Sequence, residues 1–278
     1  MNKFIAKKDD VGRILYKYIL IVCDNVPKSR IEKIFRQKDI KVNGIRTNDK
    51  QYKLQLGDEI IVYGLLEIKK PEKKNTANIN FKVIYEDKNL LIIDKETNVA
   101  MHSEENCLDD QVHKYLNFKK TSSFVPSSIG RLDKKTSGLV VYAKNYPTLV
   151  TFEAAQKHFE KIYQFISENF NQEKLDITVR LEKDIKNEKM KVNPDFGIKA
   201  HTIFFKEGNR KFAQILTGKK HQIRATLEYL KAPILGDTKY GGKKAKRLYL
   251  HSYSIKFAAL PEEYAEYNDQ IFISYPRW

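Results

Sequence analysis

The sequence predicts an α+β protein with a small N-terminal region and a larger region rich in β-strands. Two amphipathic helices and a hairpin signal fall within the first 64 residues, whereas short β-branched and aromatic runs predominate from Phe81 onward. Few helices interrupt these runs, which is typical of a mixed, mainly antiparallel sheet with flanking helices. We therefore expect an N-terminal domain over 1–64, a linker over 65–80 and a second domain over 81–278.

The N-terminal region begins with apolar residues at helical spacing from Val11 to Leu20, which predict an amphipathic helix. A second helix is expected after Pro27-Lys28, where Ser29 and Glu32 match a capping box. Its apolar stripe predicts a buried face, and a basic stripe lies on its other side. The basic stripe includes Arg30, Lys33 and Arg36.

A hairpin and a final strand complete this region. Asn43-Gly44 lies between 40–42 and 45–46, and this dipeptide is a strong hairpin signal. Gly57-Asp58 then precedes the strand 59–63. Together, the two helices, the hairpin and this turn resemble the S4-type RNA-binding domain. The resemblance implies RNA contacts at the basic stripe and at Asn43, although an ordinary solvated helix face is the alternative reading of the stripe.

The overall charge indicates a polyanionic partner. Lys and Arg number 51 against 35 Asp and Glu, a net charge of +16 that is spread along the chain. Such a field attracts phosphate backbones, and 16 Tyr and 15 Phe offer stacking surfaces for bases. A general lysine bias without a functional role is the alternative explanation.

Several classes of protein are not favoured by the composition. Neither of the two cysteines, Cys23 and Cys107, has a partner at metal spacing, and isolated thiols fit a reducing compartment. The six histidines show no zinc-binding spacing. No apolar run is long enough to span a membrane. We expect a cytoplasmic monomer with no metal, no cofactor and no membrane contact.

The second region alternates expected strands with a few helices. The strands are predicted at 81–85, 90–93, 139–143, 162–166, 177–181, 200–205 and 212–216, and the helices at 109–118, 147–159 and 221–230.

One loop in this region contains a candidate catalytic residue. Asp133 lies in the polar stretch 130–138, which is punctuated by glycines and runs directly into the apolar strand 139–143. A carboxylate in this position can be catalytic, but an Asp before Thr-Ser-Gly can also be a turn former that binds backbone N–H groups.

Five ordered segments resemble the RluA-type pseudouridine synthases. The first is Arg131-Leu132-Asp133 followed, after two residues, by Thr-Ser-Gly-Leu. The others are 161–163 (Lys-Ile-Tyr), 217–224 (Thr-Gly-Lys-Lys-His-Gln-Ile-Arg), 233–241 and 248–251. Gly130, Lys135 and Lys219 depart from the commonest family pattern, and 95–98 lacks its usual Pro and Gly.

The resemblance implies roles for particular residues. Asp133 is the expected catalytic carboxylate, Tyr163 the residue that stacks on the uracil and assists proton transfer, and Arg224 the cation that pairs with Asp133. The resemblance also suggests substrate or RNA contacts, which are expected at Arg131, Thr136, Lys161, His221 and Gln222. Whether Asp133 attacks C1′ or removes the C2′ proton stays open.

Pseudouridine formation breaks the N-glycosidic bond and joins C5 to C1′, which requires no redox change, metal or cosubstrate. The S4-like segment resembles large-subunit enzymes of the RluC kind, so ribosomal RNA or its assembly intermediates are the expected partner. The same chemistry on tRNA, a non-catalytic RNA-binding or ribosome-assembly protein, and a glycosidase or nucleoside hydrolase are the alternatives. The last is disfavoured because no second acid/base carboxylate is evident beside Asp133.

Overall fold

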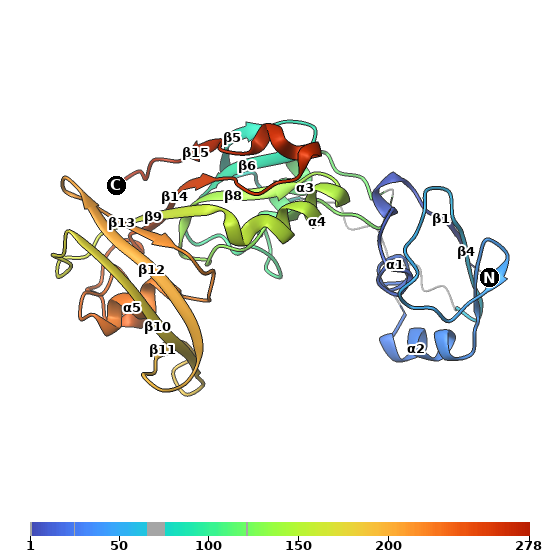
Figure 1. Cartoon of the computed structure of the whole chain (residues 1–278), viewed down its shortest axis with the longest axis horizontal. Coiled ribbons are helices and arrows are strands. Elements are labelled where there is room, and N and C mark those ends of the chain that lie inside the picture. Colours follow the sequence, from blue (N-terminus) through green and yellow to red (C-terminus); the bar gives the residue numbers. More distant parts are fainter. Residues whose placement is uncertain (1, 25, 66–75, 121) are drawn as a thin grey trace. The chain divides into compact units, whose positions relative to one another are not determined.

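The computed structural model describes residues 2–24, 26–65, 76–120 and 122–278, which form two compact units (Figure 1). The smaller unit comprises Met1–Thr76 together with Leu116–Pro126 and Asn145–Pro147. The larger unit comprises Ala77–Tyr115, Ser127–Lys144 and Thr148–Trp278. Most of the linker expected over 65–80 lies outside the described residues.

The smaller unit has a four-stranded sheet in the order β1-β4-β2-β3, with all neighbours antiparallel. Its elements are β1 (Asn2–Ile5), a 3-10 turn (Lys8–Asp10), α1 (Leu15–Val22), α2 (Lys28–Arg36), β2 (Ile40–Val42), β3 (Ile45–Arg46) and β4 (Glu59–Val62). The two predicted helices, the hairpin and the last strand are thus confirmed, while β1 was not predicted. Ile31, Ile34 and Phe35 of α2 are buried in the core of this unit, as its apolar stripe predicts.

The predicted capping box at Ser29 is wrong. Helix α2 begins at Lys28 after Pro27, so Ser29 already lies inside the first turn. Glu32 instead accepts a hydrogen bond from the Tyr16 hydroxyl at 2.5 Å and pairs with Lys50. The fixed φ of proline suits the start of a helix, which explains the earlier beginning.

A buried carboxylate joins the N-terminal segment to the excursion Leu116–Pro126 inside the smaller unit. Asp10 is 1% exposed, and its Oδ2 accepts a hydrogen bond from the backbone N–H of Lys7 at 2.8 Å. Its Oδ1 accepts hydrogen bonds from the backbone N–H of Ser123, at 2.8 Å, and from the Ser123 hydroxyl. The segment Leu116–Pro126 therefore provides hydrogen-bond donors to the Asp10 carboxylate, whose charge would be costly to bury without partners.

Asp10→Ala should lower the free energy of unfolding by about 2–4 kcal/mol, because it leaves three donors without an acceptor, and the two donors of Ser123 are buried. Ser123→Ala should cost less, and the double variant less than the sum of the two, since the residues share one interaction. Denaturant unfolding measures all three, with Asp49→Ala at an exposed position as the control. Strictly additive effects would contradict the shared interaction.

The larger unit is built on an eleven-stranded sheet in the order β11-β10-β12-β13-β9-β14-β8-β6-β5, with β15 paired to β14 and β7 to β8. Only β14 and β8 run parallel, so the prediction of a mixed, mainly antiparallel sheet is confirmed. The strands are β5 (Phe81–Glu86), β6 (Leu90–Lys95), β7 (Ser127–Ser128), β8 (Ser137–Ala143), β9 (Glu160–Phe165), β10 (Lys174–Asp184), β11 (Lys189–Val192), β12 (Ile198–Glu207), β13 (Arg210–Ile215), β14 (Leu250–Lys256) and β15 (Ile271–Ile273).

Three helices flank this sheet: α3 (Leu108–Tyr115), α4 (Tyr146–Ala155) and α5 (Gln222–Tyr229). All three match predicted helices, although each is shorter than expected. Phe152 of α4 packs with the apolar residues of β6 and β8, while Ile223 and Leu227 of α5 pack with those of β9, β12 and β13. Figure 1 shows α5 beside the hairpins of β10, β11 and β12.

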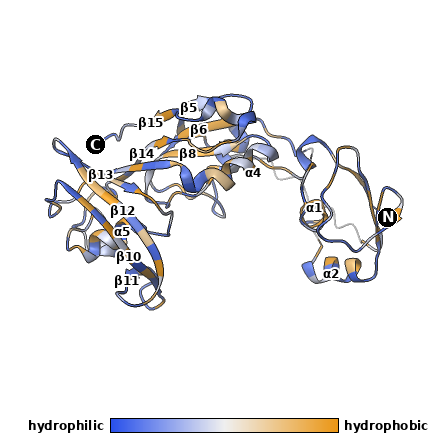
Figure 2. Ribbon diagram, in the orientation of Figure 1, coloured by the Kyte–Doolittle hydropathy of each residue, from blue (hydrophilic) through white to orange (hydrophobic). Residues whose placement is uncertain are grey.

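The central strands form the apolar interior of the larger unit. Every residue of β6 and β8 is buried, and Figure 2 shows the apolar colouring of these strands. The long strand β10 instead alternates between buried or partly buried and exposed residues along most of its length. Strands β6 and β10 are each second from an end of the sheet order, so their position does not explain the difference. Residues of β6 and β8 pack with α4 in one core, whereas the buried residues of β10 that pack with α5 alternate with exposed ones.

Gly138 allows β8 to approach β14 closely. Its φ is +109°, and a Cβ atom there would lie 2.4 Å from the backbone oxygen of Ser252. Only glycine fits this contact and this conformation without strain. The Thr-Ser-Gly sequence therefore ends the loop of Asp133 at a fixed position beside β14.

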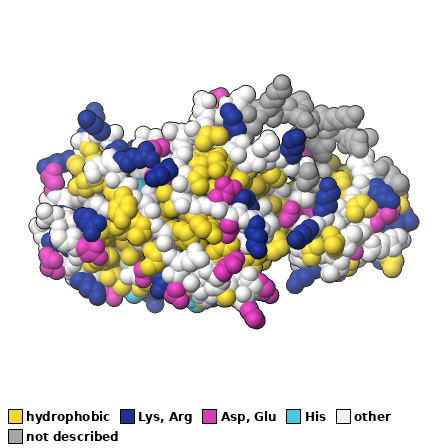
Figure 3. Space-filling view, turned by 90° about the horizontal axis from the view of Figure 1, so that it is seen from above, with side chains coloured by type: hydrophobic (Ala, Val, Ile, Leu, Met, Phe, Trp, Pro, Cys, Tyr) yellow, Lys and Arg dark blue, Asp and Glu magenta, His cyan; other side chains and the backbone are white. Residues whose placement is uncertain are grey.

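Lys and Arg side chains are spread over the visible face of each unit rather than collected at one end of the chain (Figure 3). This distribution agrees with the charge pattern of the sequence. Among the helices of the described ranges, none is long and apolar enough to cross a bilayer.

Candidate active site

The candidate catalytic loop lies between β7 and β8, and strand register brings Tyr163 next to it. Gly138 of β8 pairs with Ser252 of β14, and Ser252 pairs in turn with Tyr163 of β9. One rung across three strands thus connects the end of the loop to the predicted stacking residue. Since Asp133 precedes Gly138 by five residues, the loop and Tyr163 border the same space.

This space is a cavity of about 490 Å³ within the larger unit. All eight candidate residues of this unit line it, although they come from three separate stretches of sequence. They are Arg131, Asp133, Thr136, Lys161, Tyr163, His221, Gln222 and Arg224. A cavity of this volume is typical of small-ligand sites, and here both polar and apolar side chains line it.

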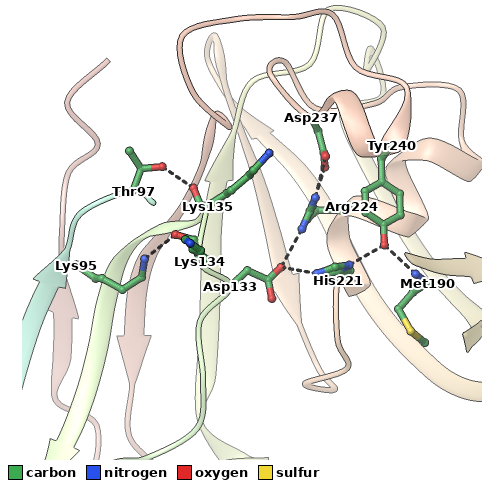
Figure 4. Close-up of polar contacts among 10 residues, drawn as sticks. All are labelled: Lys95, Thr97, Asp133, Lys134, Lys135, Met190, His221, Arg224, Asp237 and Tyr240. Carbon is green, nitrogen blue, oxygen red and sulfur yellow. Dashed lines mark hydrogen bonds and ion pairs between the residues drawn. The ribbon is translucent and has the colours of Figure 1, made fainter. Parts of the chain in front are cut away.

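Asp133 is contacted through one of its two carboxylate oxygens (Figure 4). Arg224 donates a hydrogen bond from Nη1 to Oδ2 at 3.3 Å, and the Nε2 atom of His221 lies 3.5 Å from the same oxygen. The predicted pairing of Arg224 with Asp133 is therefore present in the structure. Both contacts stabilise negative charge on the carboxylate and fix its orientation.

Arg224 is itself held by an acidic partner that the sequence did not single out. Its Nε and Nη2 atoms donate to the two carboxylate oxygens of Asp237 at 2.7 and 2.8 Å, in a bidentate pair. Its guanidinium carbon also lies 4.8 Å from the centre of the Tyr240 ring. Although burial opposes the charged form, the hydrogen bonds and charge of Asp237 raise the pKa of Arg224. The cation beside Asp133 is thus firmly positioned.

His221 occupies the position before α5 with φ of +52°, in the left-handed region. Its Nδ1 atom lies 2.8 Å from the Tyr240 hydroxyl, which also accepts a hydrogen bond from the backbone N–H of Met190 at 2.9 Å. Burial lowers the pKa of His221, and the positive charges of Arg224, Lys220 and Lys239 lower it further, against the opposing effect of Asp133. His221 is therefore neutral at neutral pH.

Lys95 supports the loop that contains Asp133 by hydrogen bonds to backbone carbonyl groups. This side chain is fully buried, and Nζ donates to the carbonyl oxygens of Glu96, Val99 and Lys134 at 2.8, 3.0 and 3.1 Å. Burial lowers the pKa of Lys95 to about 7, while the charge of Asp133 opposes that shift. In its charged form Lys95 has three N–H hydrogens, one for each of these carbonyl oxygens. The charged side chain therefore holds the backbone next to Asp133 in place.

Tyr163 is partly buried and its hydroxyl is hydrogen-bonded with Ser252. Burial and the negative charge of Asp133 raise the pKa of Tyr163 to about 12. The phenol is therefore protonated at neutral pH, so it can pass on a proton but is not a ready-made base.

Three further cavity residues differ in accessibility. Arg131 is exposed at the edge of the cavity. Lys161 is partly buried, and desolvation lowers its pKa. Thr136 is 1% exposed, and its hydroxyl oxygen has no partner among the described residues. Lys161 is thus partly accessible at the cavity, whereas the Thr136 hydroxyl oxygen is buried.

Gln222 lines the cavity and also supports the loop ahead of α5. It is 3% exposed, and its Oε1 accepts hydrogen bonds from the Thr217 hydroxyl at 2.8 Å and the Lys219 backbone at 3.1 Å. Its amide nitrogen donates to the carbonyl of His201 and to the hydroxyl of Thr202. The side chain thus fixes the loop 217–220 ahead of α5.

The candidate RNA-binding residues of the smaller unit also differ in their surroundings. Arg30, Lys33 and Arg36 are exposed on α2, and Arg30 donates to the carbonyl of Gly64 at 2.8 Å. The Asn43 amide instead donates to Asp58 at 2.8 Å and accepts from the backbone N–H of Glu59 at 2.9 Å. Asn43 therefore supports the hairpin, and its predicted RNA contact stays a prediction.

The buried residues Asp237, Tyr240 and Lys95 were not predicted as parts of the site. Asp237 and Tyr240 follow Gly236 and precede Gly241 in a segment that reads as a simple turn, and their side chains meet Arg224 and His221 only after folding. The available signal was that Asp237 and Tyr240 both lie within the segment 233–241 that resembles the family. In the described part of the chain, no cluster of three His, Cys, Asp or Glu residues is placed to hold a metal ion.

Sequence comparisons agree with this geometry. The RNA pseudouridylate synthase family matches residues 89–229. An uncharacterized RNA pseudouridine synthase of Mycoplasma capricolum is 35% identical over 100% of this chain and 99% of its own length. Ribosomal large subunit pseudouridine synthase C of Vibrio cholerae is 27% identical over 90% of this chain and 86% of its own. Ribosomal large subunit pseudouridine synthase D of Borreliella burgdorferi is 31% identical over 80% and 78%.

The fold also has solved relatives. Human RNA pseudouridylate synthase domain containing 1 superposes with a TM-score of 0.55 and 15% identity, covering 74% of this chain and 94% of that one. At this identity the likeness concerns the α+β architecture. The full-length sequence match and the family match to half of the chain decide the relationship. The chain therefore belongs to the RluA-type family of RNA pseudouridine synthases, isomerases that convert uridine in RNA to pseudouridine.

Proposed function

We propose that this enzyme isomerises specific uridines of large-subunit ribosomal RNA, with Asp133 as the catalytic carboxylate. The observation that supports this role most strongly is the one-sided contact of Asp133. Arg224 and His221 both approach Oδ2, and among the described residues no side chain contacts Oδ1, which would then face the substrate. A carboxylate held in this way inside a cavity is oriented and charged before the substrate enters.

The reaction balances without any co-reactant. The N1–C1′ bond breaks, the detached uracil turns within the cavity, C5 bonds to C1′, and the proton of C5 is lost as N1 gains one. The ionised Oδ1 serves either route, by attacking C1′ or by removing the C2′ proton. The cavity must also hold the free base and exclude water, because hydrolysis would end the reaction as uracil and an abasic site.

Tyr163 supplies a surface on which the uracil stacks and a hydroxyl that relays a proton. Tyr163→Phe keeps the ring, so we expect RNA affinity within about twofold of wild type and a rate lower by about 10²-fold. Tyr163→Leu removes the ring as well, and should also weaken binding by about 1–3 kcal/mol. Single-turnover rates and filter binding separate the two roles. A wild-type rate for Tyr163→Phe would exclude proton relay by the hydroxyl.

The smaller unit is proposed to bind the RNA around the target. Residues 1–64 form an S4-type domain in this account, with 65–80 as the linker to the catalytic domain over 81–278. The exposed Lys33 and Arg36 are expected to contact phosphates, while Arg131 enters the RNA where the target nucleotide leaves the stack. Lys161 and Thr136 would then contact the flipped nucleotide inside the cavity.

The ribosomal target is supported by the relatives from Vibrio cholerae and Borreliella burgdorferi, which are named as pseudouridine synthases of the large ribosomal subunit. We place the reaction in the cytoplasm, on ribosomal RNA or on assembly intermediates. The same chemistry on tRNA is the competing assignment, because the cavity geometry concerns the uridine and does not distinguish the RNA that carries it.

Mapping of pseudouridine decides between these RNAs. Carbodiimide treatment followed by reverse transcription gives a stop at each pseudouridine, and cells that lack this protein should lose one or more stops in large-subunit ribosomal RNA. A plasmid copy of the wild type should restore them, while Asp133→Asn should not. Loss of stops in tRNA alone would refute the ribosomal assignment, and loss of no stop in any RNA would refute the function.

A further inference from the structure

We propose that Tyr240 is a positioning residue for this reaction, which holds His221 as the neutral tautomer whose Nε2–H is directed at Oδ2 of Asp133. The inference rests on the proposed role of Asp133. It concerns two side chains outside the predicted catalytic set of Asp133, Tyr163 and Arg224. The His221 imidazole bridges them, since one ring nitrogen lies 2.8 Å from the Tyr240 hydroxyl and the other 3.5 Å from Asp133 (Figure 4).

The direction of the hydrogen bonds follows from the donors present. The backbone N–H of Met190 can only donate, so the Tyr240 oxygen is an acceptor in that contact. The phenolic hydrogen then needs an acceptor of its own, and within the described chain Nδ1 of His221 is the one that lies within reach. If Nδ1 carried the hydrogen instead, the fully buried phenol would lose its acceptor, at a cost of about 1–3 kcal/mol.

A hydrogen-free Nδ1 places the single imidazole hydrogen on Nε2, on the side of Asp133. The distance of 3.5 Å to Oδ2 is longer than a good hydrogen bond. Catalytic contacts in an empty site are often long and tighten when the substrate binds. The Nε2–H group is therefore aimed in advance at the carboxylate that the reaction uses.

The surroundings fix this arrangement mechanically. Tyr240 is buried, and its ring meets the His221 ring edge-on, with centroids 5.6 Å apart and planes at 88°. The same short segment carries Asp237, which holds Arg224. The segment 237–240 thus supports both of the groups that contact Asp133.

The charges around His221 explain why a neutral donor is useful. Asp133 faces the imidazole, but so do Arg224, Lys220 and Lys239, and burial also favours the neutral ring. Arg224 already supplies one full positive charge to Oδ2. A second cation would stabilise the ionised carboxylate further and weaken it as a nucleophile or base, whereas a neutral N–H orients it with less loss of reactivity.

The tautomer can be observed directly. Long-range ¹H–¹⁵N correlation spectra of histidine-labelled protein distinguish a protonated from an unprotonated ring nitrogen, and His221→Gln identifies the signal among the six histidines. At pH 7.5 we expect the spectrum of His221 to show a protonated Nε2 and an unprotonated Nδ1. In Tyr240→Phe the Nδ1 signal should shift toward a mixture of tautomers. An Nδ1–H tautomer or an imidazolium in the wild type would overturn the proposal.

Kinetics provide an independent readout. Tyr240→Phe retains the ring over Arg224, so we expect the single-turnover rate to fall about tenfold while the KM for RNA stays within about twofold. Tyr229→Phe, at an exposed position on α5, is the matched control. At His221 itself, Gln can place an amide N–H near the position of Nε2 and should retain more activity than Leu, which has no donor.

The outcomes separate this inference from the proposed function. An inactive wild type would refute the function, but the spectra would still report the tautomer. An active wild type with an inactive Asp133→Asn, together with full activity in Tyr240→Phe, would refute the role of Tyr240 alone. Equal loss in His221→Gln and His221→Leu would show that the Nε2 donor is not what the site requires.

Discussion

Asp133→Asn is expected to abolish pseudouridine formation while the protein stays folded and still binds RNA. The carboxamide has nearly the same shape, but it cannot act as a nucleophile or a base at C1′ or C2′. It also removes the negative charge that Arg224 and His221 contact at Oδ2. We expect the single-turnover rate on a ribosomal RNA fragment to fall by about 10⁴-fold or more.

The control for this variant is Asp195→Asn, which changes an exposed carboxylate in the loop between β11 and β12. It should retain the wild-type rate, since Asp195 lies outside the cavity. Circular dichroism and filter binding confirm that both variants fold and bind. Substantial turnover by a folded Asp133→Asn protein would move the catalytic role to another residue.

Arg224→Met should remove both activity and stability. Asp237 is 3% exposed and loses both hydrogen bonds of its bidentate pair, so a charge remains buried without a partner. Breaking such a pair from one side lowers the free energy of unfolding by about 3–5 kcal/mol. Asp133 also loses its guanidinium contact, and the rate should fall by at least about 10²-fold.

A double variant separates the two effects of Arg224. Arg224→Met with Asp237→Asn neutralises the stranded carboxylate, so it should recover much of the lost stability but none of the lost activity. Denaturant unfolding and single-turnover rates test this directly. If activity returned together with stability, Arg224 would be a structural residue with no effect of its own on Asp133.

The predictable part of the fold is the part set by local patterns. The apolar runs of β6 and β8 are buried on both faces, and the Asn43-Gly44 hairpin forms where its dipeptide indicates. The edge strands β1 and β11 were harder to predict, because each is only four residues long and depends on a neighbouring strand. The predicted cap at Ser29 failed because the N-cap of the helix is Pro27, two residues earlier.

The site was predictable where a family pattern marks it and less so where support comes from distant residues. Asp133 and Arg224 are 91 positions apart, and no periodicity connects them, yet they are in contact. Asp237 and Tyr240 look like turn residues until the fold places them under Arg224 and His221. Asn98 shows a related point, since its φ of +63° is in the left-handed region at a position where the family resemblance implies glycine.

The central claim is that the cavity around Asp133 isomerises uridine and keeps the base. The most direct measurement uses purified protein and ribosomal RNA labelled with tritium at C5 of uridine. We expect tritium release into water, with an equal amount of pseudouridine in the digested RNA and no free uracil. Release of uracil with abasic RNA would indicate hydrolysis, and RNA binding without tritium release would indicate a protein that only binds; either result would contradict the account.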